Sequence, residues 1–315
     1  MKRGDGWVRA LAPAKVNLWI DVLERRADGY HELDTGLLAL ELADTLEARA
    51  RPEAGVRLEL GGPFATPDVP SDERNLAWRA AAACLEVLGE RRGVELRLVK
   101  NVPSQAGLGA GSADAAAALV ACEAALGRAL DEPGALALLS RLGSDCVFFR
   151  AAAATGFARC RGRGEVVQPL GPPPADWCVA VLVPDVGAPT AQVYAALRGP
   201  LSRAGAVSTV RSCLLHLEEG VARGALSNGL EEAALSAVAG LAPWRALLDD
   251  NGAAHFRLCG SGSSFFGLYR DPQEAARCLS ALAQTARARK LEPRALFTTR
   301  PACRGARLVV TPSRG

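Results

Sequence analysis

Three glycines, at positions 107, 109 and 111, alternate with small or apolar residues in the segment VPSQAGLGAGSADAA, residues 102–116. A loop of this kind has little side-chain bulk to keep an anion away from its backbone N–H groups. A strand is expected at residues 94–99 before the loop, and an alanine-rich helix from near Ser112 after it. The N-terminus of that helix adds partial positive charge. The segment therefore predicts a cradle for the phosphates of a nucleotide.

Two familiar phosphate-binding patterns do not fit this loop. No lysine follows the glycines as in the Walker loop, and the third glycine comes one residue too early for the dinucleotide fingerprint GxGxxG. A glycine-rich turn can also serve only to let a helix pack close to a sheet, and both interpretations stay open on the loop alone. Pro103 and Ser112 favour phosphate binding, although serine is also a common helix N-cap.

Lys15 and Asp145 are charged residues in apolar surroundings. Lys15 lies inside the strand-like segment APAKVNLWIDVL, and Asp145 precedes the apolar run CVFF. A buried charge is unfavourable unless it is paired or hydrogen-bonded, so each of the two needs a partner or a function. A solvent-facing Lys15 and a helix-capping Asp145 are the plainer alternatives, and neither residue decides the matter alone.

Two further segments could contact a ligand. Tyr30 and His31 follow the turn at residues 28–29, and an aromatic ring beside an imidazole suits stacking on a ligand ring and hydrogen bonding to its edge. An ordinary strand start is the plainer explanation of this pair. The cluster GSGSS at residues 260–264 could form a second anion-facing turn, or only a tight connection between two strands.

The hydrophobic pattern predicts the elements that position these residues. Strands alternate with amphipathic or alanine-rich helical segments along the whole chain. Strands are expected at residues 8–23, 37–42, 45–49, 56–60, 94–99, 178–183, 256–259, 265–269 and 295–299, with a hairpin around RCRGRGEVV. Helices are expected at residues 75–88, 112–126, 133–142, 190–197, 207–219, 229–250 and 272–288.

The clearest linker in the chain is the sequence GPPP at residues 171–174. Three prolines stiffen the backbone and end any helix. The length of 315 residues also favours two domains over one. We therefore expect an N-terminal domain at residues 1–171 and a C-terminal domain at residues 175–315.

Composition argues against several classes of protein. A hydrophobic share of 49% excludes a largely disordered chain, and a net charge of +3 with 5% aromatic residues does not favour nucleic-acid binding. No apolar run approaches the roughly 18 residues of a membrane span, and the first residues lack the apolar core of a signal peptide, so we expect a cytoplasmic protein without membrane contact. The nine cysteines and three histidines show no metal-ligand spacing, which predicts reduced thiols and no structural zinc.

Taken together, six segments occur in the same order as in the GHMP kinases, and the chain resembles that family over about residues 12–269. They are APAKVNL, RADGYH, DERNL, the glycine-rich segment, LGSD and CGSGSS. RADGYH is typical of the cytidine-recognising branch. The resemblance implies an α+β fold, the two-domain GHMP kinase fold with the active site in the inter-domain cleft. It also implies a monomer or homodimer that uses ATP with Mg²⁺ and phosphorylates the 2-hydroxyl of a polyol linked to cytidine diphosphate, in the non-mevalonate route to isoprenoid precursors.

The resemblance also implies roles for individual residues. Lys15 and Asp145 become the catalytic pair, in which Asp145 accepts the hydroxyl proton and Lys15 orients it. The residues implied in substrate binding are Asn17 near the reacting end, Tyr30 and Tyr194 on the two faces of the cytosine, and His31 at its edge. The residues implied in ATP binding are Asn75, Leu76 and Lys100 around the adenosine, and Pro103, Ser104, Gln105, Ala106, Gly107, Leu108, Gly109, Ala110, Gly111, Ser112 and Ala113 around the triphosphate. No residue is expected to form a metal site of its own.

Two alternatives remain beside this interpretation. One is another GHMP small-molecule kinase of the homoserine or mevalonate type, in which Tyr30 and His31 would have no evident role. The other is a ligand sensor that keeps the fold without catalysis, which would not need both Lys15 and Asp145. The chain departs from the family pattern at Gln105, where glycine or alanine is usual, and at Ala110, where glycine is usual.

Overall fold

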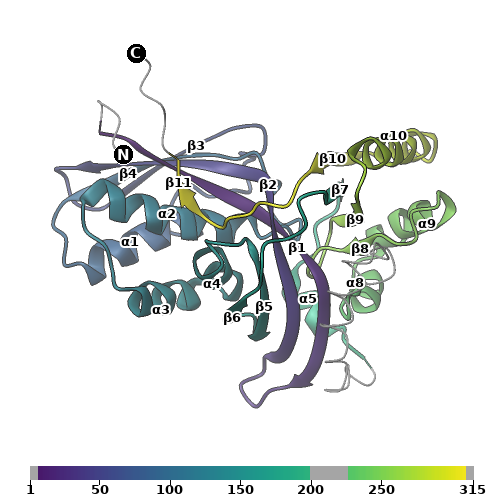
Figure 1. The fold of residues 1–315 in the computed structure, drawn as a ribbon, viewed down its shortest axis with the longest axis horizontal. Coiled ribbons are helices and arrows are strands. Elements are labelled where there is room, and N and C mark those ends of the chain that lie inside the picture. The colour runs from purple at the N-terminus through teal and green to yellow at the C-terminus, as the bar shows by residue number, and fades with distance from the viewer. Residues whose placement is uncertain (1–5, 199–225, 310–315) are drawn as a thin grey trace.

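The computed structural model describes residues 6–198 and 226–309, which form two β-sheets with helices packed around them (Figure 1). The helix expected at residues 207–219 lies outside the described residues. A long hairpin of two N-terminal strands runs between the helices of the N-terminal half and the elements of the C-terminal half. Both strands of this hairpin contribute residues to the candidate site.

The first sheet has seven strands, in the order β11-β1-β2-β4-β3, with β5 on β2 and β6 on β5. Its strands are β1 (Val8–Arg25), β2 (His31–Arg51), β3 (Val56–Gly61), β4 (Gly93–Val99), β5 (Phe157–Gly162), β6 (Val166–Pro169) and β11 (Arg307–Leu308). The two strands expected at residues 37–42 and 45–49 form one continuous strand, which pairs with β1 on both sides of a register shift. β11 had no counterpart in the predicted pattern.

Four helices belong to the N-terminal half (Figure 1). They are α1 (Leu76–Val87), α2 (Ala110–Leu126), α3 (Glu132–Leu142) and α4 (Ser144–Ala151). Alanines make up most of α2 and are almost all buried, so the backbone of this helix can approach the sheet and its neighbours closely. The helix thereby holds the glycine-rich loop, which directly precedes it, against the middle of the first sheet.

The second sheet is antiparallel and has the strand order β10-β7-β9-β8. Its strands are β7 (Cys178–Pro184), β8 (Arg257–Leu258), β9 (Phe265–Tyr269) and β10 (Pro293–Thr299), and its helices are α5 (Thr190–Ala195), α8 (Glu231–Ala237), α9 (Ala242–Asp250) and α10 (Pro272–Ala288). The single helix expected at residues 229–250 is divided by a short 3₁₀ turn, Ala239–Leu241. Pro243 explains the break, because proline fits only the first turn of the helix that follows.

The two sheets share a hydrophobic core. Trp19 of β1 and Val102 of the glycine-rich segment pack in one buried cluster with Val181 of β7 and Phe266 of β9. The boundary expected at residues 171–175 falls between β6 and β7. β11, however, pairs with β1 and returns the end of the described chain to the first sheet. The division into residues 1–171 and 175–315 stays a prediction, and it does not account for this last strand.

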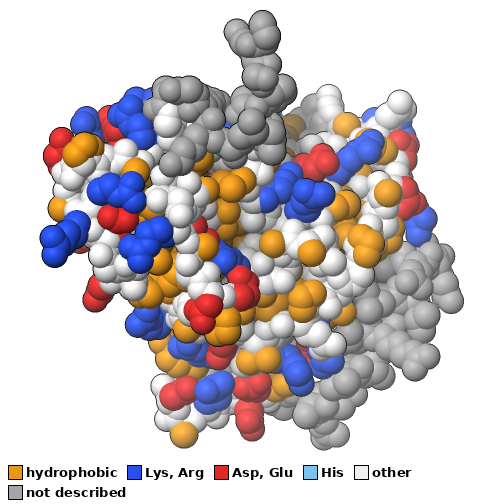
Figure 2. Space-filling view, turned by 60° about the vertical axis from the view of Figure 1, so that its left-hand side comes forward, with side chains coloured by type: hydrophobic (Ala, Val, Ile, Leu, Met, Phe, Trp, Pro, Cys, Tyr) orange, Lys and Arg blue, Asp and Glu red, His pale blue; other side chains and the backbone are white. Residues whose placement is uncertain are grey.

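The surface charges and the thiols of the described residues say little about function. On the face drawn in Figure 2, basic and acidic side chains are interspersed among the described residues. The cysteines within the described ranges are free thiols and most of them are buried. None of the helices in the described part of the chain is long and apolar enough to span a bilayer.

Candidate active site

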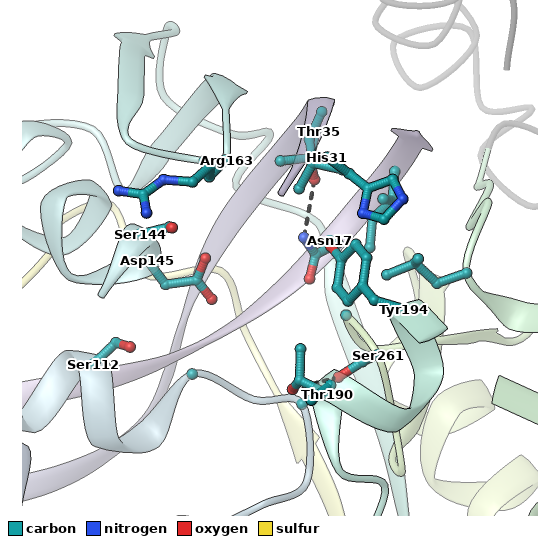
Figure 3. A pocket seen from close by; sticks show the side chains of 18 of the residues that line it. Asn17, His31, Thr35, Ser112, Ser144, Asp145, Arg163, Thr190, Tyr194 and Ser261 are labelled. Carbon is teal, nitrogen blue, oxygen red and sulfur yellow. Dashed lines mark hydrogen bonds between the residues drawn. The ribbon is translucent and has the colours of Figure 1, made fainter. Parts of the chain in front are cut away.

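A cavity of about 1290 Å³ lies between the two halves of the molecule. Its lining comes from the β1–β2 hairpin, the glycine-rich loop, the first turn of α4, α5 and the turn between β8 and β9 (Figure 3). This volume exceeds the roughly 300–1,000 Å³ that is usual for one small-molecule ligand. The cavity is therefore large enough to hold two ligands together.

Lys15 and Asp145 both line this cavity and form an ion pair there. The Lys15 ammonium lies 3.3 Å from Asp145 Oδ2 and donates a 2.8 Å hydrogen bond to Asn17 Oδ1. Asn17 in turn donates to Thr35 Oγ1, which donates to the carbonyl of Trp19. Lys15 is buried, whereas about a third of the Asp145 side chain is exposed to the cavity. The lysine is thus held by fixed partners, and the carboxylate is open to a ligand.

Local backbone features aim these two side chains at each other. The pairing of β1 with β2 shifts register between Pro13 and Lys15, and the Lys15 N–H donates to the carbonyl of Leu108 in the glycine-rich loop. Asp145 lies in the first turn of α4, directly after Gly143 and Ser144. The partial positive charge at the start of a helix favours a carboxylate there. Asp145 is therefore not the helix N-cap that the plainer alternative predicted.

Two glycine-containing turns pack against each other beside this pair. Gly107 has φ +75°, and a Cβ atom on it would lie 2.0 Å from the carbonyl oxygen of Cys259. The N–H of Ser264 donates to the carbonyl of Ala106. The GSGSS segment therefore connects β8 to β9 and also brings Gly260 and Ser261 to the cavity, so it combines the two interpretations that the sequence left open.

The glycine-rich loop differs from expectation at two residues. α2 begins at Ala110 with Gly109 as its N-cap, so Ser112 is not the cap that its residue type suggested. Its side chain instead lies at the cavity wall (Figure 3). Gln105 has φ +58°, a left-handed conformation that favours glycine, at a position where the resemblance expects glycine or alanine.

The residues predicted to bind the cytosine do not all lie together: His31 and Tyr194 are adjacent, whereas Tyr30 lies against Arg163, which stands beside Ser144 and Asp145 (Figure 3). The rings of His31 and Tyr194 lie 5.3 Å apart between centroids, and the guanidinium of Arg163 lies 4.7 Å from the centre of the exposed Tyr30 ring. Burial lowers the pKa of His31, and the charge of Arg25 lowers it further, so the imidazole is neutral at pH 7. A neutral imidazole can both donate and accept a hydrogen bond. Burial, and to a smaller extent Asp145, raises the pKa of the Tyr194 hydroxyl.

All but four of the predicted site residues line the cavity. Ser104 and Ala113 are parts of the glycine-rich segment that do not reach it. Asn75 is the N-cap of α1, where its side chain accepts from the Ala77 N–H and donates to the carbonyl of Pro70. Lys100 is 1% exposed and ion-paired with two buried carboxylates, so its side chain does not line the cavity, and its assignment to the adenosine site stays a prediction.

Some polar cavity residues had no recognisable signal in the sequence. They are Thr35, Ser144, Arg163 and Thr190. Arg163 belongs to the predicted β5–β6 hairpin, but nothing in RCRGRGE distinguishes an arginine that faces a cavity from one that faces solvent. Thr190 makes a 2.9 Å hydrogen bond with Ser261, which joins α5 to the GSGSS turn (Figure 3). Such a contact between distant segments becomes visible only in the folded chain.

The arrangement of these groups suits a group transfer between two bound molecules. A carboxylate beside a buried ammonium can accept a proton from a hydroxyl while the ammonium offsets negative charge. Backbone N–H groups of a glycine-rich loop at a helix N-terminus suit an anion such as phosphate. The adjacent rings of His31 and Tyr194 suit a planar ring with polar edges.

Comparison with known proteins identifies two related regions in the chain. The model of the GHMP kinases N terminal domain matches residues 75–152, which include the glycine-rich loop and α4. The model of the GHMP kinases C terminal domain matches residues 209–288, which include the GSGSS turn.

Curated proteins are similar to this chain over most of its length. A 4-diphosphocytidyl-2-C-methyl-D-erythritol kinase of Pelotomaculum thermopropionicum is 38% identical over 87% of this chain and 93% of its own. The protein of the same name from Shouchella clausii is 33% identical over 86% of this chain and 89% of its own.

Solved structures have the same fold. A crystal structure of 4-(cytidine 5'-diphospho)-2C-methyl-D-erythritol kinase is 35% identical, with a TM-score of 0.72 over 93% of this chain and 100% of that chain. A homoserine kinase from Cytophaga hutchinsonii has a TM-score of 0.75 over 98% of this chain and 99% of its own, at 21% identity. At that identity the likeness concerns the fold alone.

Proposed function

This chain belongs to the GHMP kinases, and within them to the family of 4-diphosphocytidyl-2-C-methyl-D-erythritol kinases, and from this premise we propose that it transfers the γ-phosphate of ATP to the 2-hydroxyl of the methylerythritol group of that cytidyl substrate. It is thus a small-molecule kinase of isoprenoid precursor synthesis. The two-domain α+β fold and the cavity between the halves agree with this membership.

Asp145 is the general base in the proposed reaction. Its carboxylate accepts the proton of the substrate hydroxyl as the hydroxyl oxygen forms a bond to the γ-phosphorus. The bond between that phosphorus and the bridging oxygen breaks, and ADP leaves. Lys15 orients the carboxylate across their 3.3 Å contact and offsets the negative charge that develops between hydroxyl and phosphate. Asn17 and Thr35 fix the lysine in that orientation.

The triphosphate of ATP would occupy the glycine-rich loop. Gly107, Gly109 and Gly111 all line the cavity, and the N-terminus of α2 follows them directly. Leu76 lies on the same side, where it could contact the nucleoside. ATP is the co-substrate of GHMP kinases, so a phosphate cradle here agrees with the family.

Mg²⁺ would be carried by the phosphate oxygens of ATP. Among residues 6–198 and 226–309, no cluster of three or more His, Cys, Asp or Glu side chains is arranged to hold a metal ion. Mg²⁺ commonly binds through substrate phosphates, waters and only one or two protein oxygens. The Ser112 hydroxyl is an oxygen at the cavity wall that fits this requirement (Figure 3). When bound, the ion neutralises charge on the transferring phosphate.

The observation that carries the proposal is the order of groups along one cavity. The glycine-rich loop and the pair His31–Tyr194 line different parts of the cavity, and Asp145, which is ion-paired with Lys15, lies between Ser112 and that pair in Figure 3. A nucleotide phosphate at the loop and a cytosine ring at that pair would bring a phosphate and a hydroxyl together at the carboxylate. His31, whose pKa is lowered, supplies a neutral imidazole for the polar edge of the ring.

The proposal is tested by measuring ADP release with Mg-ATP and three acceptors. We expect turnover with 4-diphosphocytidyl-2-C-methyl-D-erythritol and none with homoserine or mevalonate. Turnover with one of the other acceptors would keep the proposed Lys15–Asp145 chemistry but reject the cytosine site. Binding of ATP without turnover of any acceptor would instead favour the ligand sensor.

Tyr30→Ala is expected to raise the KM for the cytidyl substrate by about tenfold, because stacking of a base on an aromatic ring contributes roughly 1–3 kcal/mol. The KM for ATP should stay unchanged, since Tyr30 lies in the turn between β1 and β2 and not in the glycine-rich loop. Steady-state kinetics with each substrate varied in turn measures both constants. Tyr30→Phe is the matched control, because it keeps the ring and removes only the hydroxyl. An unchanged KM for the cytidyl substrate in Tyr30→Ala would reject the assigned contact.

A further inference from the structure

The most deeply buried charges in the described chain lie outside the cavity. Lys100 is ion-paired with Asp44 and with Asp114, and all three side chains are less than 5% exposed. Asp44 comes from β2, Lys100 follows the end of β4, and Asp114 lies in the second turn of α2. Burying three ionisable groups is unfavourable unless each is compensated, so the cluster needs a structural or functional explanation.

The cluster is attached to both ends of the glycine-rich loop. One oxygen of Asp44 accepts hydrogen bonds from the backbone N–H groups of Asn101 and Val102, the latter at 2.8 Å. These residues begin the loop. Asp114 follows its last glycine by three positions and sits on the helix whose N-terminus completes the loop. Lys100 joins the two carboxylates, so one ammonium connects the start of the loop to the helix after it.

Hydrogen bonds to neighbouring segments also hold the chain at Lys100 and Asn101. Its backbone N–H donates to the carbonyl of Gly61, and its own carbonyl accepts from the N–H of Phe64. The amide of Asn101 also donates to the carbonyl of Ala43. The backbone is therefore held by neighbouring segments at the residues where the glycine-rich loop begins.

The cluster contains two carboxyl groups and one ammonium. Oδ1 of Asp114 has no hydrogen-bond partner among the described residues. Burial raises the pKa of Asp114 and the charge of Asp44 raises it further, although Lys100 opposes both. Burial lowers the pKa of Lys100, but Asp114 and Asp44 outweigh this effect and raise it, so the two carboxyl groups favour the charged ammonium.

We propose that Asp44, Lys100 and Asp114 are positioning residues for ATP: they fix the two ends of the glycine-rich loop, and thereby its N–H groups, in the conformation that binds phosphate. The proposal rests on the proposed function in so far as that loop binds ATP. Asp44 has the largest share, because it alone contacts the loop backbone, and a carboxylate strengthens the hydrogen bonds that it accepts. None of the three touches the cavity, so they act on ATP only through the loop.

Asp44→Asn tests this role, because it keeps the size of the side chain and removes its charge. We expect the Kd for Mg-ATP, measured by calorimetry without acceptor, to rise by roughly tenfold, as the weakening of charge-assisted hydrogen bonds predicts. The KM for ATP should rise equally. The KM for the acceptor and kcat at saturating ATP should stay within about threefold, since the groups that contact the acceptor keep their positions.

Two matched variants separate positioning from general destabilisation. Asp34 lies in the same strand as Asp44 and forms a buried ion pair with Arg159, away from the glycine-rich loop. The substitution Asp34→Asn removes the negative charge of that pair. It should leave the Kd for Mg-ATP unchanged even if the melting temperature falls. Asp44→Glu, which keeps the charge but displaces the oxygens, should raise the Kd and takes the place of Asp44→Asn if the latter does not fold.

Three results would overturn the proposal. They are a folded Asp44→Asn with the Kd of the wild type, an equal rise in Asp34→Asn, and a loss confined to kcat. Binding of Mg-ATP is measured without acceptor, so it does not depend on which acceptor the enzyme uses. A wild type that binds Mg-ATP but fails to phosphorylate the cytidyl substrate would reject the proposed function and leave the comparison of Kd values valid. A wild type that binds no Mg-ATP would reject both.

Discussion

Asp145→Asn is expected to lower kcat by roughly 10²–10⁴-fold, the usual contribution of a general base, while Mg-ATP still binds. The amide has the shape of the carboxylate but cannot accept the hydroxyl proton. Because the side chain lies at the cavity wall and Lys15 keeps its hydrogen bond to Asn17, the substitution should leave the fold and the glycine-rich loop intact. Single-turnover phosphorylation and calorimetry with Mg-ATP measure the two effects separately.

A second variant tests whether Asp145 acts together with Lys15. Lys15→Met should also lower kcat, because the carboxylate loses the ammonium 3.3 Å away. Residues that act as a unit give non-additive losses, so the double variant should be little worse than Asp145→Asn alone. Turnover of Asp145→Asn within tenfold of the wild type would remove Asp145 from the role of base, and fully additive losses would mean that the two residues act separately.

The sequence pattern predicts the framework of this molecule well, because most of its elements have strong local signals. α10 begins and ends at the predicted residues, where the charged and apolar positions alternate with helical spacing and Pro272 stands at the start. β1 is recognisable from its many apolar residues, which alternate around Lys15 and Asn17. The short strand β11 was not predictable, because two residues carry no periodicity and pair only when the end of the described chain returns to β1.

The candidate site was predictable where it follows contiguous motifs. Lys15, the glycine-rich loop and Asp145 each stand in a recognisable segment, and the cavity brings these segments together. Lys100 shows the limit of such reasoning. Only the resemblance assigned it to ATP binding, and in the structure its ammonium donates to Asp44, 56 residues earlier in the chain, inside the protein. Only the folded chain reveals that partner.

Ser112 shows the same limit at shorter range. Serine is a favourable N-cap, and its position after the glycines suggested that role. The left-handed conformation of Gly109, φ +70°, starts α2 earlier and moves Ser112 into the first turn. One backbone conformation therefore decides whether this hydroxyl caps a helix or faces a ligand, and the residue type alone does not report it.

Gly109→Ala is expected to lower kcat by at least about a hundredfold, a loss typical of catalytic groups displaced by an ångström, and to raise the Kd for Mg-ATP by roughly tenfold. A Cβ atom on Gly109 would lie 2.8 Å from Cγ and 3.0 Å from Cε of Lys15, and 3.3 Å from the ring of Phe149. The phenyl ring is fully buried, so the lysine side chain has to move and its ammonium leaves Asp145. The same change disturbs the loop conformation, because alanine disfavours a positive φ.

Gly127→Ala is the matched control for this variant. Gly127 stands at the opposite end of α2 with nearly the same conformation, φ +69°, but nothing lies within 4 Å of the Cβ it would gain. Both substitutions therefore add the same backbone strain, about 1–2 kcal/mol, and only Gly109→Ala adds the collision with Lys15. Both should lower the melting temperature, whereas only Gly109→Ala should impair turnover and ATP binding. Equal activity in the two variants would mean that the absence of a side chain at Gly109 serves the helix start alone, and that Lys15 does not depend on it.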